Sequence, residues 1–278
     1  MTLNPDTSPI MGIGLNQVQA IRDAVCSILE RKILPRATDA ADVRNWLTTQ
    51  GLEVRTQEWE TDKPFSLIGW AVAEHRRAAL GKDWSSAEGM SSSGVNPDAK
   101  WVGVHRSGAG WDEGAKFCIA AAFVPLLGSL EQFELDVLKC LLEYRPRGTP
   151  GPKEEWEDLF VDMEVVTEVP KVKGDDDTEY YTRPAIWTWI KPTALDKDQR
   201  RKIFSRIFNI NLAFEDKNRA RKEVNKLRKD FFEKRNKIAH GRGGVDFTLK
   251  EFVDADVFVM RSMLHLAEEC RTKQRLIV

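Results

Sequence analysis

Apolar residues recur along most of the chain at the spacing of amphipathic helices. The first run lies between residues 15 and 34, with apolar positions at Val18, Ile21, Val25, Ile28 and Leu29. This spacing predicts a helix, which Pro35 ends. Similar patterns predict further helices at residues 39–50, 65–80, 115–144, 196–208, 217–240 and 248–271. The chain is therefore predicted to be mainly α-helical.

Local signals mark some ends of these predicted helices. Thr248 and Glu251 match a capping box, in which the side chain of each accepts a hydrogen bond from a backbone N–H near the other. Gly51 follows the second predicted helix, and Gly241 follows the helix at residues 217–240.

Two regions interrupt the helical pattern. Residues 89–114 are rich in Gly and Ser, which indicates a loop or a domain junction. Residues 163–172 and 178–190 alternate roughly between polar and apolar positions around an acidic turn, which favours a β-hairpin. Six of the nine tryptophans precede residue 115. We therefore expect residues 1–114 to form a small helical region with its own core. Residues 115–278 are expected to form a helical bundle with the hairpin as an insertion.

Composition and charge narrow the class of protein. Hydrophobic residues make up 42% of the chain and charged residues 31%, which is typical of soluble globular proteins. The four cysteines form no CxxC pair and lie in apolar helical contexts, so buried free thiols in a reducing compartment are expected. The N-terminus lacks a signal-peptide pattern, and the apolar run at residues 117–130 is too short to span a membrane. A cytoplasmic protein without membrane contact is expected.

Positive charge is concentrated in one segment of a chain whose net charge is −1. Residues 215–242 contain eleven basic and five acidic residues, so the local net charge is +6. Such a segment can bind a polyanion, and a solvated basic helix face is the alternative. The candidates for contacts with nucleic-acid phosphates are Arg228, Lys234, Lys237 and Arg242.

The end of this basic helix combines an arginine, an asparagine and a histidine. Arg235 follows Phe231 by four residues, so it lies on the apolar stripe, where a buried guanidinium needs an acidic or phosphate partner. Asn236 and His240 are also four apart, so the amide can fix the imidazole tautomer. Arg235 and His240 are separated by roughly 140° around an ideal helix. Bringing both to one atom requires a distorted helix end or a second copy of the helix.

Histidine and arginine together can cleave RNA. The imidazole can take a proton from a ribose 2′-hydroxyl or give one to the leaving oxygen. The guanidinium can hold the phosphate and stabilise its developing charge. The other histidines, His75, His105 and His265, are isolated in the sequence, so we predict no metal site and no other cofactor.

The segment from Arg235 to Gly241, RNKIAHG, resembles the Arg-polar-x-x-x-His motif of HEPN-domain ribonucleases. In that family the motif lies near the end of a long helix of an α-helical bundle, and here one further predicted helix follows it. The earlier segment around Glu131 resembles the first helix of a HEPN subgroup, which places a glutamate inside the bundle. This resemblance implies that Glu131 pairs with Arg235 or orients His240. It covers roughly residues 115–278.

The resemblance also implies an activity and partners. Proteins of this kind are metal-independent endoribonucleases that act as homodimers, with a composite active site at the subunit interface. They leave a 2′,3′-cyclic phosphate, and many act on tRNA as toxins or as effectors of antiviral defence. The sequence does not decide whether a regulatory partner binds residues 1–114. The alternative is a non-catalytic helical binding or assembly module, in which Arg235 forms a structural ion pair with Glu131.

Overall fold

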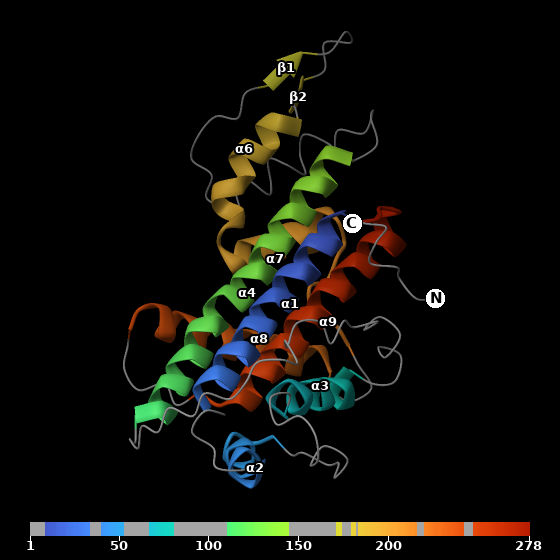
Figure 1. Ribbon diagram of the computed structural model, residues 1–278. Helices are drawn as coiled ribbons and strands as arrows, with labels where there is room; N and C mark the ends of the chain where they lie inside the picture. Colours follow the sequence, from blue (N-terminus) through green and yellow to red (C-terminus); the bar gives the residue numbers. More distant parts are fainter. Residues whose placement is uncertain are drawn as a thin grey trace. The chain divides into compact units, whose positions relative to one another are not determined.

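A computed structural model describes residues 9–33, 40–52, 67–80, 110–144, 171–173, 179–181, 183–215, 220–241 and 247–278. These residues are mainly helical, as predicted (Figure 1). The helices are α1 (Pro9–Ile33), α2 (Ala40–Thr49), α3 (Leu67–Leu80), α4 (Gly110–Tyr144), α6 (Arg183–Ala194), α7 (Lys197–Ile207), α8 (Arg221–Ala239) and α9 (Leu249–Gln274). The two short strands are β1 (Lys171–Lys173) and β2 (Glu179–Tyr181).

The chain divides into two compact units. Unit 1 comprises residues 1–6, 15–129 and 225–261, and unit 2 comprises residues 7–14, 130–224 and 262–278. The long helices α1, α4, α8 and α9 contribute segments to both units. Each unit therefore combines residues from both sides of the boundary that the sequence predicted at residue 114.

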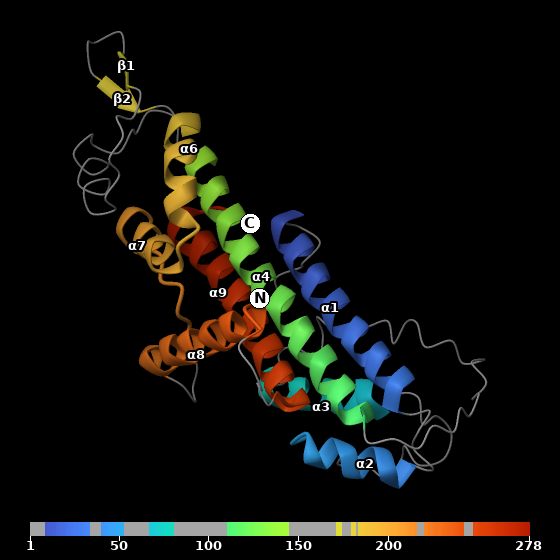
Figure 2. The same ribbon diagram turned by 90° about the vertical axis from the view of Figure 1, so that its left-hand side faces the viewer.

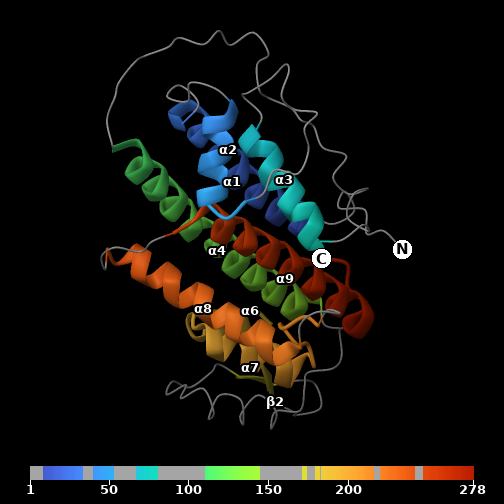
Figure 3. The same ribbon diagram turned by 90° about the horizontal axis from the view of Figure 1, so that it is seen from below.

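Aromatic packing holds the helices of unit 1 together. Its segments of α1, α4 and α9 run side by side (Figure 1, Figure 2), and α2 and α3 lie next to α1 (Figure 3). The ring of Phe123 on α4 lies edge-on to Phe231 of α8 and to Phe247, with centroid distances of 6.0 and 4.6 Å. Phe231 in turn contacts Phe258 of α9 at 5.4 Å. The C-terminal part of α8 is thereby fixed against α4 and α9.

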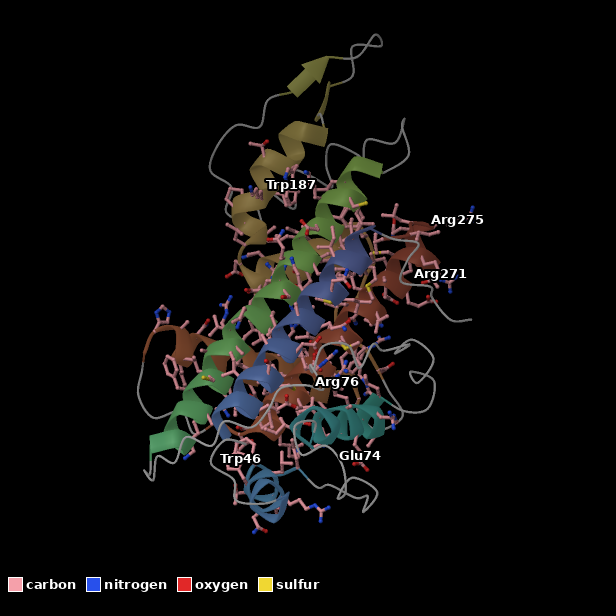
Figure 4. All side chains as sticks on the ribbon, viewed as in Figure 1. Trp46, Glu74, Arg76, Trp187, Arg271 and Arg275 are labelled. Atoms are coloured by element: carbon pink, nitrogen blue, oxygen red, sulfur yellow. The ribbon has the colours of Figure 1, made fainter. Side chains whose placement is uncertain are left out.

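A buried ionic cluster joins α1, α3 and α9 within unit 1. The carboxylate of Asp256 is fully buried, and its Oδ2 atom lies 2.5 Å from Arg76 Nε and 3.7 Å from Arg22 Nη1. Figure 4 labels Arg76 among the side chains between α3 and α9. Burial of one charge alone would cost several kcal/mol, so the pairing is required. Helices α1 and α3 are thus joined to α9 by buried ion pairs.

The helix ends follow the predicted signals. Glu251 N donates to Thr248 Oγ1 at 3.2 Å and Thr248 N donates to Glu251 Oε2 at 3.0 Å, so the predicted capping box is confirmed. Asp196 caps α7 by accepting hydrogen bonds from the backbone of residues 198 and 199, each at 2.9 Å.

The strand prediction for residues 178–190 is wrong over most of its length. Strands β1 and β2 pair antiparallel, with Val172 opposite Tyr180, but each has only three residues. Residues 183–194 form α6, in which Ile190 and Ala194 are buried at helical spacing. Pro184 lies in the first helical turn, where a missing N–H has no cost. Most of the other predicted strand, residues 163–170, lies outside the described residues.

Helix α4 is unusually apolar. By length and composition alone, residues 114–142 could cross a membrane. This is a weak indication, because the core helix of a soluble protein meets the same criterion. In unit 1, Ile119, Phe123 and Leu126 of α4 are fully buried within the protein.

All four cysteines are free thiols, as predicted, but only Cys270 is fully buried, whereas Cys26, Cys118 and Cys140 are half-buried. Burial raises the pKa of both Cys26 and Cys270 to about 12. These two thiols therefore stay protonated near neutral pH and are poor nucleophiles.

A buried arginine–glutamate pair connects α7 to α4 within unit 2. Arg200 Nε donates to Glu134 Oε2 at 2.9 Å, and Arg200 Nη1 donates to the carbonyl of Ala194 at 2.7 Å. Both charged side chains are 1% exposed. Because neither ion can recover hydration, loss of one partner should be far more costly than loss of both.

We predict that Arg200→Ala lowers the free energy of unfolding by about 3–5 kcal/mol, since it leaves Glu134 buried and unpaired. The double variant Arg200→Met/Glu134→Leu should unfold near the wild-type midpoint in urea. Arg201→Ala, which removes an exposed arginine next in sequence, is the matched control and should change stability by less than about 0.5 kcal/mol. A double variant as unstable as Arg200→Ala would contradict this account.

A second prediction concerns Glu30 of α1. Burial raises the pKa of Glu30 to about 7, against a hydrogen bond from the Gly69 backbone that lowers it. The folded state therefore keeps a proton that the unfolded chain loses above its ordinary pKa, and stability falls as pH rises through about 7. Relative to wild type, the free energy of unfolding of Glu30→Gln should increase by on the order of 2 kcal/mol from pH 4 to pH 8, as measured by urea unfolding.

Glu268→Gln provides the control for this pH profile. The hydrogen bond from Arg271 lowers the pKa of Glu268, so that carboxylate contributes stability that is lost only as pH falls below its ordinary range. Replacement of Glu268 should leave the slope of the free energy of unfolding against pH unchanged between pH 5 and pH 8. An equal change of slope in both variants would show that Glu30 is not the group responsible.

Candidate functional site

The candidate site lies at the C-terminal end of α8 in unit 1. Phe231 and Phe232 are buried and hold this part of the helix, whose last residue is Ala239. The backbone of His240 still donates to Asn236 O at 3.1 Å, and Gly241 N donates to Ile238 O at 3.1 Å. Gly241 has a φ of 60°, a conformation that favours glycine and ends the helix. The predicted helix end is thus confirmed.

Arg235 is half-buried and points along the packing side of the helix. Its guanidinium carbon lies 5.9 Å from the centre of the Phe232 ring. Its Nη1 atom donates a hydrogen bond to Asn236 Oδ1 at 2.9 Å. The amide of Asn236 therefore engages Arg235, whereas the sequence suggested that it would orient His240.

His240 lies on the solvent-exposed turn that follows the helix. Its imidazole forms no hydrogen bond or ion pair with any residue in the described part of the chain. Asn236, one turn earlier, is exposed as well. An imidazole placed in this way is accessible to a large ligand, and both ring nitrogens remain open to it.

The four predicted phosphate-binding residues occupy different environments. Arg228 is buried, with its guanidinium carbon 5.2 Å from the Phe232 ring centre, so it packs the helix rather than forming an open cationic surface. Lys234 Nζ forms an ion pair with Glu251 Oε1 at 2.5 Å and lies 4.6 Å from the centre of the Phe247 ring. Lys237 is exposed. Arg242 lies outside the described residues.

Glu131 is not the inward carboxylate that the sequence suggested. Its side chain is 21% exposed, and Oε1 lies 3.7 Å from Arg200 Nη2. Glu134, three residues later, is the fully buried acid. These residues belong to unit 2, whereas Arg235, Asn236 and His240 belong to unit 1. The three motif residues thus lie together within unit 1, and the predicted pairing of Glu131 with Arg235 or His240 stays a prediction.

Sequence reasoning overlooked Arg200, although a signal for it was present. Arg200 precedes Ile203 by three residues and Phe204 by four, and both of these are fully buried. The same spacing rule that placed Arg235 on an apolar stripe therefore applies to Arg200. A buried arginine there indicates a buried acid nearby, and α4 supplies it.

A polar cluster at the start of α9 also escaped notice. His75 Nε2 lies 2.8 Å from Asp254 Oδ1, and Lys250 Nζ donates to Asp254 Oδ2 at 2.6 Å. Hydrogen bonds from both lower the pKa of Asp254, although its partial burial acts in the opposite direction. Within the described residues, no group of three or more His, Cys, Asp or Glu side chains is arranged to hold a metal ion.

Comparisons of the chain with models of protein families, with curated proteins and with solved structures found no match. The assignment of function therefore depends on the residues and their geometry.

Proposed function

We propose that the chain is a metal-independent endoribonuclease of the HEPN type. The proposal is supported above all by the hydrogen bond from Arg235 to Asn236 beside an exposed His240, at a helix end terminated by Gly241. These are the residue types of the motif that the sequence resembles, and all lie within the last turns of one helix. The exposed side of the same helix is basic, with Lys226, Lys229 and Lys237 open to solvent.

In the proposed reaction, Arg235 binds the phosphate that is cleaved. A guanidinium has five N–H donors, and the hydrogen bond to Asn236 uses one of them. A guanidinium can bind two oxygens of one phosphate side by side. Asn236 positions Arg235 by accepting this hydrogen bond. Positive charge held in this place stabilises the additional negative charge of the transition state.

His240 transfers protons in the proposed reaction. The ribose 2′-oxygen attacks the neighbouring phosphorus, a new P–O bond forms, and the bond from phosphorus to the 5′-oxygen breaks. The proton of the 2′-hydroxyl is lost and the departing 5′-oxygen gains one, so the products are a 2′,3′-cyclic phosphate and a 5′-hydroxyl. His240 acts as the base or the acid. The resemblance also assigns Glu131 the role of orienting these residues, and its Oε1 atom lies 3.7 Å from Arg200 Nη2.

The biological role that we propose follows from the same resemblance. The enzyme would act as a toxin or as an effector of antiviral defence, with tRNA as the first substrate to test. It would act as a homodimer, because Arg235 and His240 extend from different sides of one helix. A regulatory partner at residues 1–114 is part of the same proposal.

The second candidate function is a non-catalytic RNA-binding or assembly module. The exposed lysines of α8 favour it, since a basic helix can bind a polyanion without cleaving it. A structural Arg–Glu pair of the kind that this alternative required is present between Arg200 and Glu134. Cleavage assays separate the two functions, because the module would bind RNA and leave it intact.

We predict that purified protein cleaves RNA in the presence of EDTA and that His240→Ala lowers the cleavage rate about 10²–10⁴-fold, because general acid–base catalysis is lost. Since His240 is exposed, the variant should keep the wild-type melting temperature and RNA affinity. The matched control is Lys202→Ala, which removes an exposed lysine of α7 outside this basic surface and should cleave RNA normally. RNA that stays intact with wild-type protein under all metal conditions would remove the enzymatic proposal.

A separate prediction concerns the shape of the cation. Arg235→Lys keeps the charge but loses the paired donors, so the cleavage rate should fall about 10²–10³-fold. Lys229→Arg makes the reverse change at an exposed position and should have no effect on cleavage. Rates are compared on one fluorescent RNA substrate at a single ionic strength. Full activity of Arg235→Lys would show that a point charge suffices and that paired hydrogen bonds from Arg235 to the phosphate are not needed.

A further inference from the structure

Lys234 directly precedes Arg235 on α8, and two groups near the start of α9 engage its ammonium. The Nζ atom lies 2.5 Å from Glu251 Oε1 and 4.6 Å from the centre of the Phe247 ring. The side chain of Lys234 is 25% exposed, whereas Lys237, three residues later, is open to solvent. The ammonium of Lys234 is therefore directed toward α9 within unit 1.

Glu251 uses both of its carboxylate oxygens, each toward a different helix. The Oε1 atom accepts the hydrogen bond from Lys234 of α8. The Oε2 atom accepts a hydrogen bond from the backbone N–H of Thr248 at 3.0 Å, as part of the capping box of α9. One carboxylate thus joins the C-terminal part of α8 to the first turn of α9.

The aromatic partner of Lys234 is fixed in the interior. Phe247 is 1% exposed, and the centre of its ring lies 4.6 Å from that of Phe123 on α4. A cation over an aromatic face is attracted by the negative charge of that face. The carboxylate of Glu251 and the ring of Phe247 therefore both restrain Lys234 from outside its own helix.

This restraint bears on the direction of the side chains at the end of α8. Consecutive side chains on a helix are separated by about 100°, so a helix whose Lys234 is held toward α9 has a defined direction for Arg235. His240 and Gly241 follow within two turns, and the N–H of His240 donates to the carbonyl of Asn236. Rotation or fraying of this end would displace the arginine and the histidine together.

We propose that Glu251 is a positioning residue of the candidate site, which acts through Lys234 to hold Arg235 and His240 in place. This role rests on the proposed ribonuclease function, and it gives Lys234 a contact within the protein in place of the phosphate contact that the sequence suggested. The side chains of this ion pair are 25% and 41% exposed, so the pair adds little to the stability of the whole fold. Loss of the pair should therefore change the reaction rate and leave the melting temperature unchanged.

Glu251→Gln tests this role, because glutamine can still accept the hydrogen bond of the capping box but carries no charge to pair with Lys234. With one fluorescent RNA as substrate, kcat should fall at least about fivefold at an unchanged KM, since small displacements of Arg235 or His240 slow the reaction steeply. Lys234→Met should have the same effect, and the double variant should be no slower than either single variant. Lys234→Arg can still pair with the carboxylate and should keep the wild-type rate.

Glu268→Gln is the matched control, since it makes the same substitution elsewhere on α9. Glu268 pairs with Arg271 at 2.5 Å, and its side chain is 43% exposed, against 41% for Glu251. The control thus removes an ion pair of the same kind and should cleave RNA at the wild-type rate.

Salt dependence separates a positioning role from direct contact between Lys234 and RNA. Binding is measured in the His240→Ala background, in which RNA stays intact. There Lys234→Met should leave the slope of log Kd against log salt concentration unchanged. A lysine that contacts a phosphate of single-stranded RNA would change this slope by about 0.7 on removal, and that result would overturn the proposal.

The outcomes distinguish failure of this role from failure of the proposed function. If wild type and Glu251→Gln cleave RNA equally fast, the positioning role is wrong and the ribonuclease proposal is unaffected. If wild type leaves RNA intact, the ribonuclease proposal fails, and amide hydrogen exchange then tests the restraint by itself. Exchange at His240 and Gly241 should be roughly two- to fivefold faster in Glu251→Gln than in wild type, the factor that an exposed ion pair supplies. Equal exchange rates would show that Glu251 does not restrain the end of α8.

Discussion

The pairing of buried carboxylates with arginines is the constraint on which both units depend. In unit 2, α4 brings Glu134 into the interior, and Arg200 of α7 neutralises it at 2.9 Å. In unit 1, α9 brings Asp256 into the interior, where Arg76 lies at 2.5 Å. Each pair joins helices that are distant in sequence, and either ion left buried without its partner would cost several kcal/mol. The two arginines therefore allow α4 and α9 to carry an acid in the interior.

This constraint also separates structural arginines from the arginine of the candidate site. Arg76 and Arg200 are each 1% exposed and meet carboxylates, so their positive charge is balanced within the fold. Arg235 is half-buried, and its hydrogen bond to Asn236 engages a neutral amide. An amide orients a guanidinium by accepting its hydrogen bond, and in the proposed function Asn236 positions Arg235 in this way.

The helices were predictable from sequence because their signals are local. Apolar spacing, the capping box at Thr248 and Glu251, and the glycine after α8 each depend on residues within a few positions of one another. The segment of α6 was mistaken for a strand because a short run with alternating aromatic residues fits the period of a strand as well as that of a helix. Burial of Ile190 and Ala194 at helical spacing decided the outcome. That burial depends on tertiary contacts.

The sequence could not predict which charged residues pair with one another in the interior. Glu131 and Glu134 are one helical turn apart, so both are plausible inward acids, and only the approach of α7 determines that Glu134 is buried. The contacts that cross the predicted division at residue 114 could not be predicted for a similar reason. Loop composition indicates where the chain is irregular, but Asp256 is far away in sequence from Arg22 and Arg76, which it joins. Long-range ion pairs leave no periodic trace in a single sequence.

The helix end itself limits what one copy of the candidate site can do. Arg235 is held along the packing side by Phe232 and Asn236, while His240 stands beyond the last helical turn in solvent. Side chains on different sides of a narrow helix can meet one phosphodiester only if the RNA strand crosses the helix terminus, or if a second helix end completes the site. Gly241, with a φ of 60°, ends the helix directly after His240. The same exposure leaves water around the imidazole, and a facing copy would exclude that water and strengthen every charge interaction in the site.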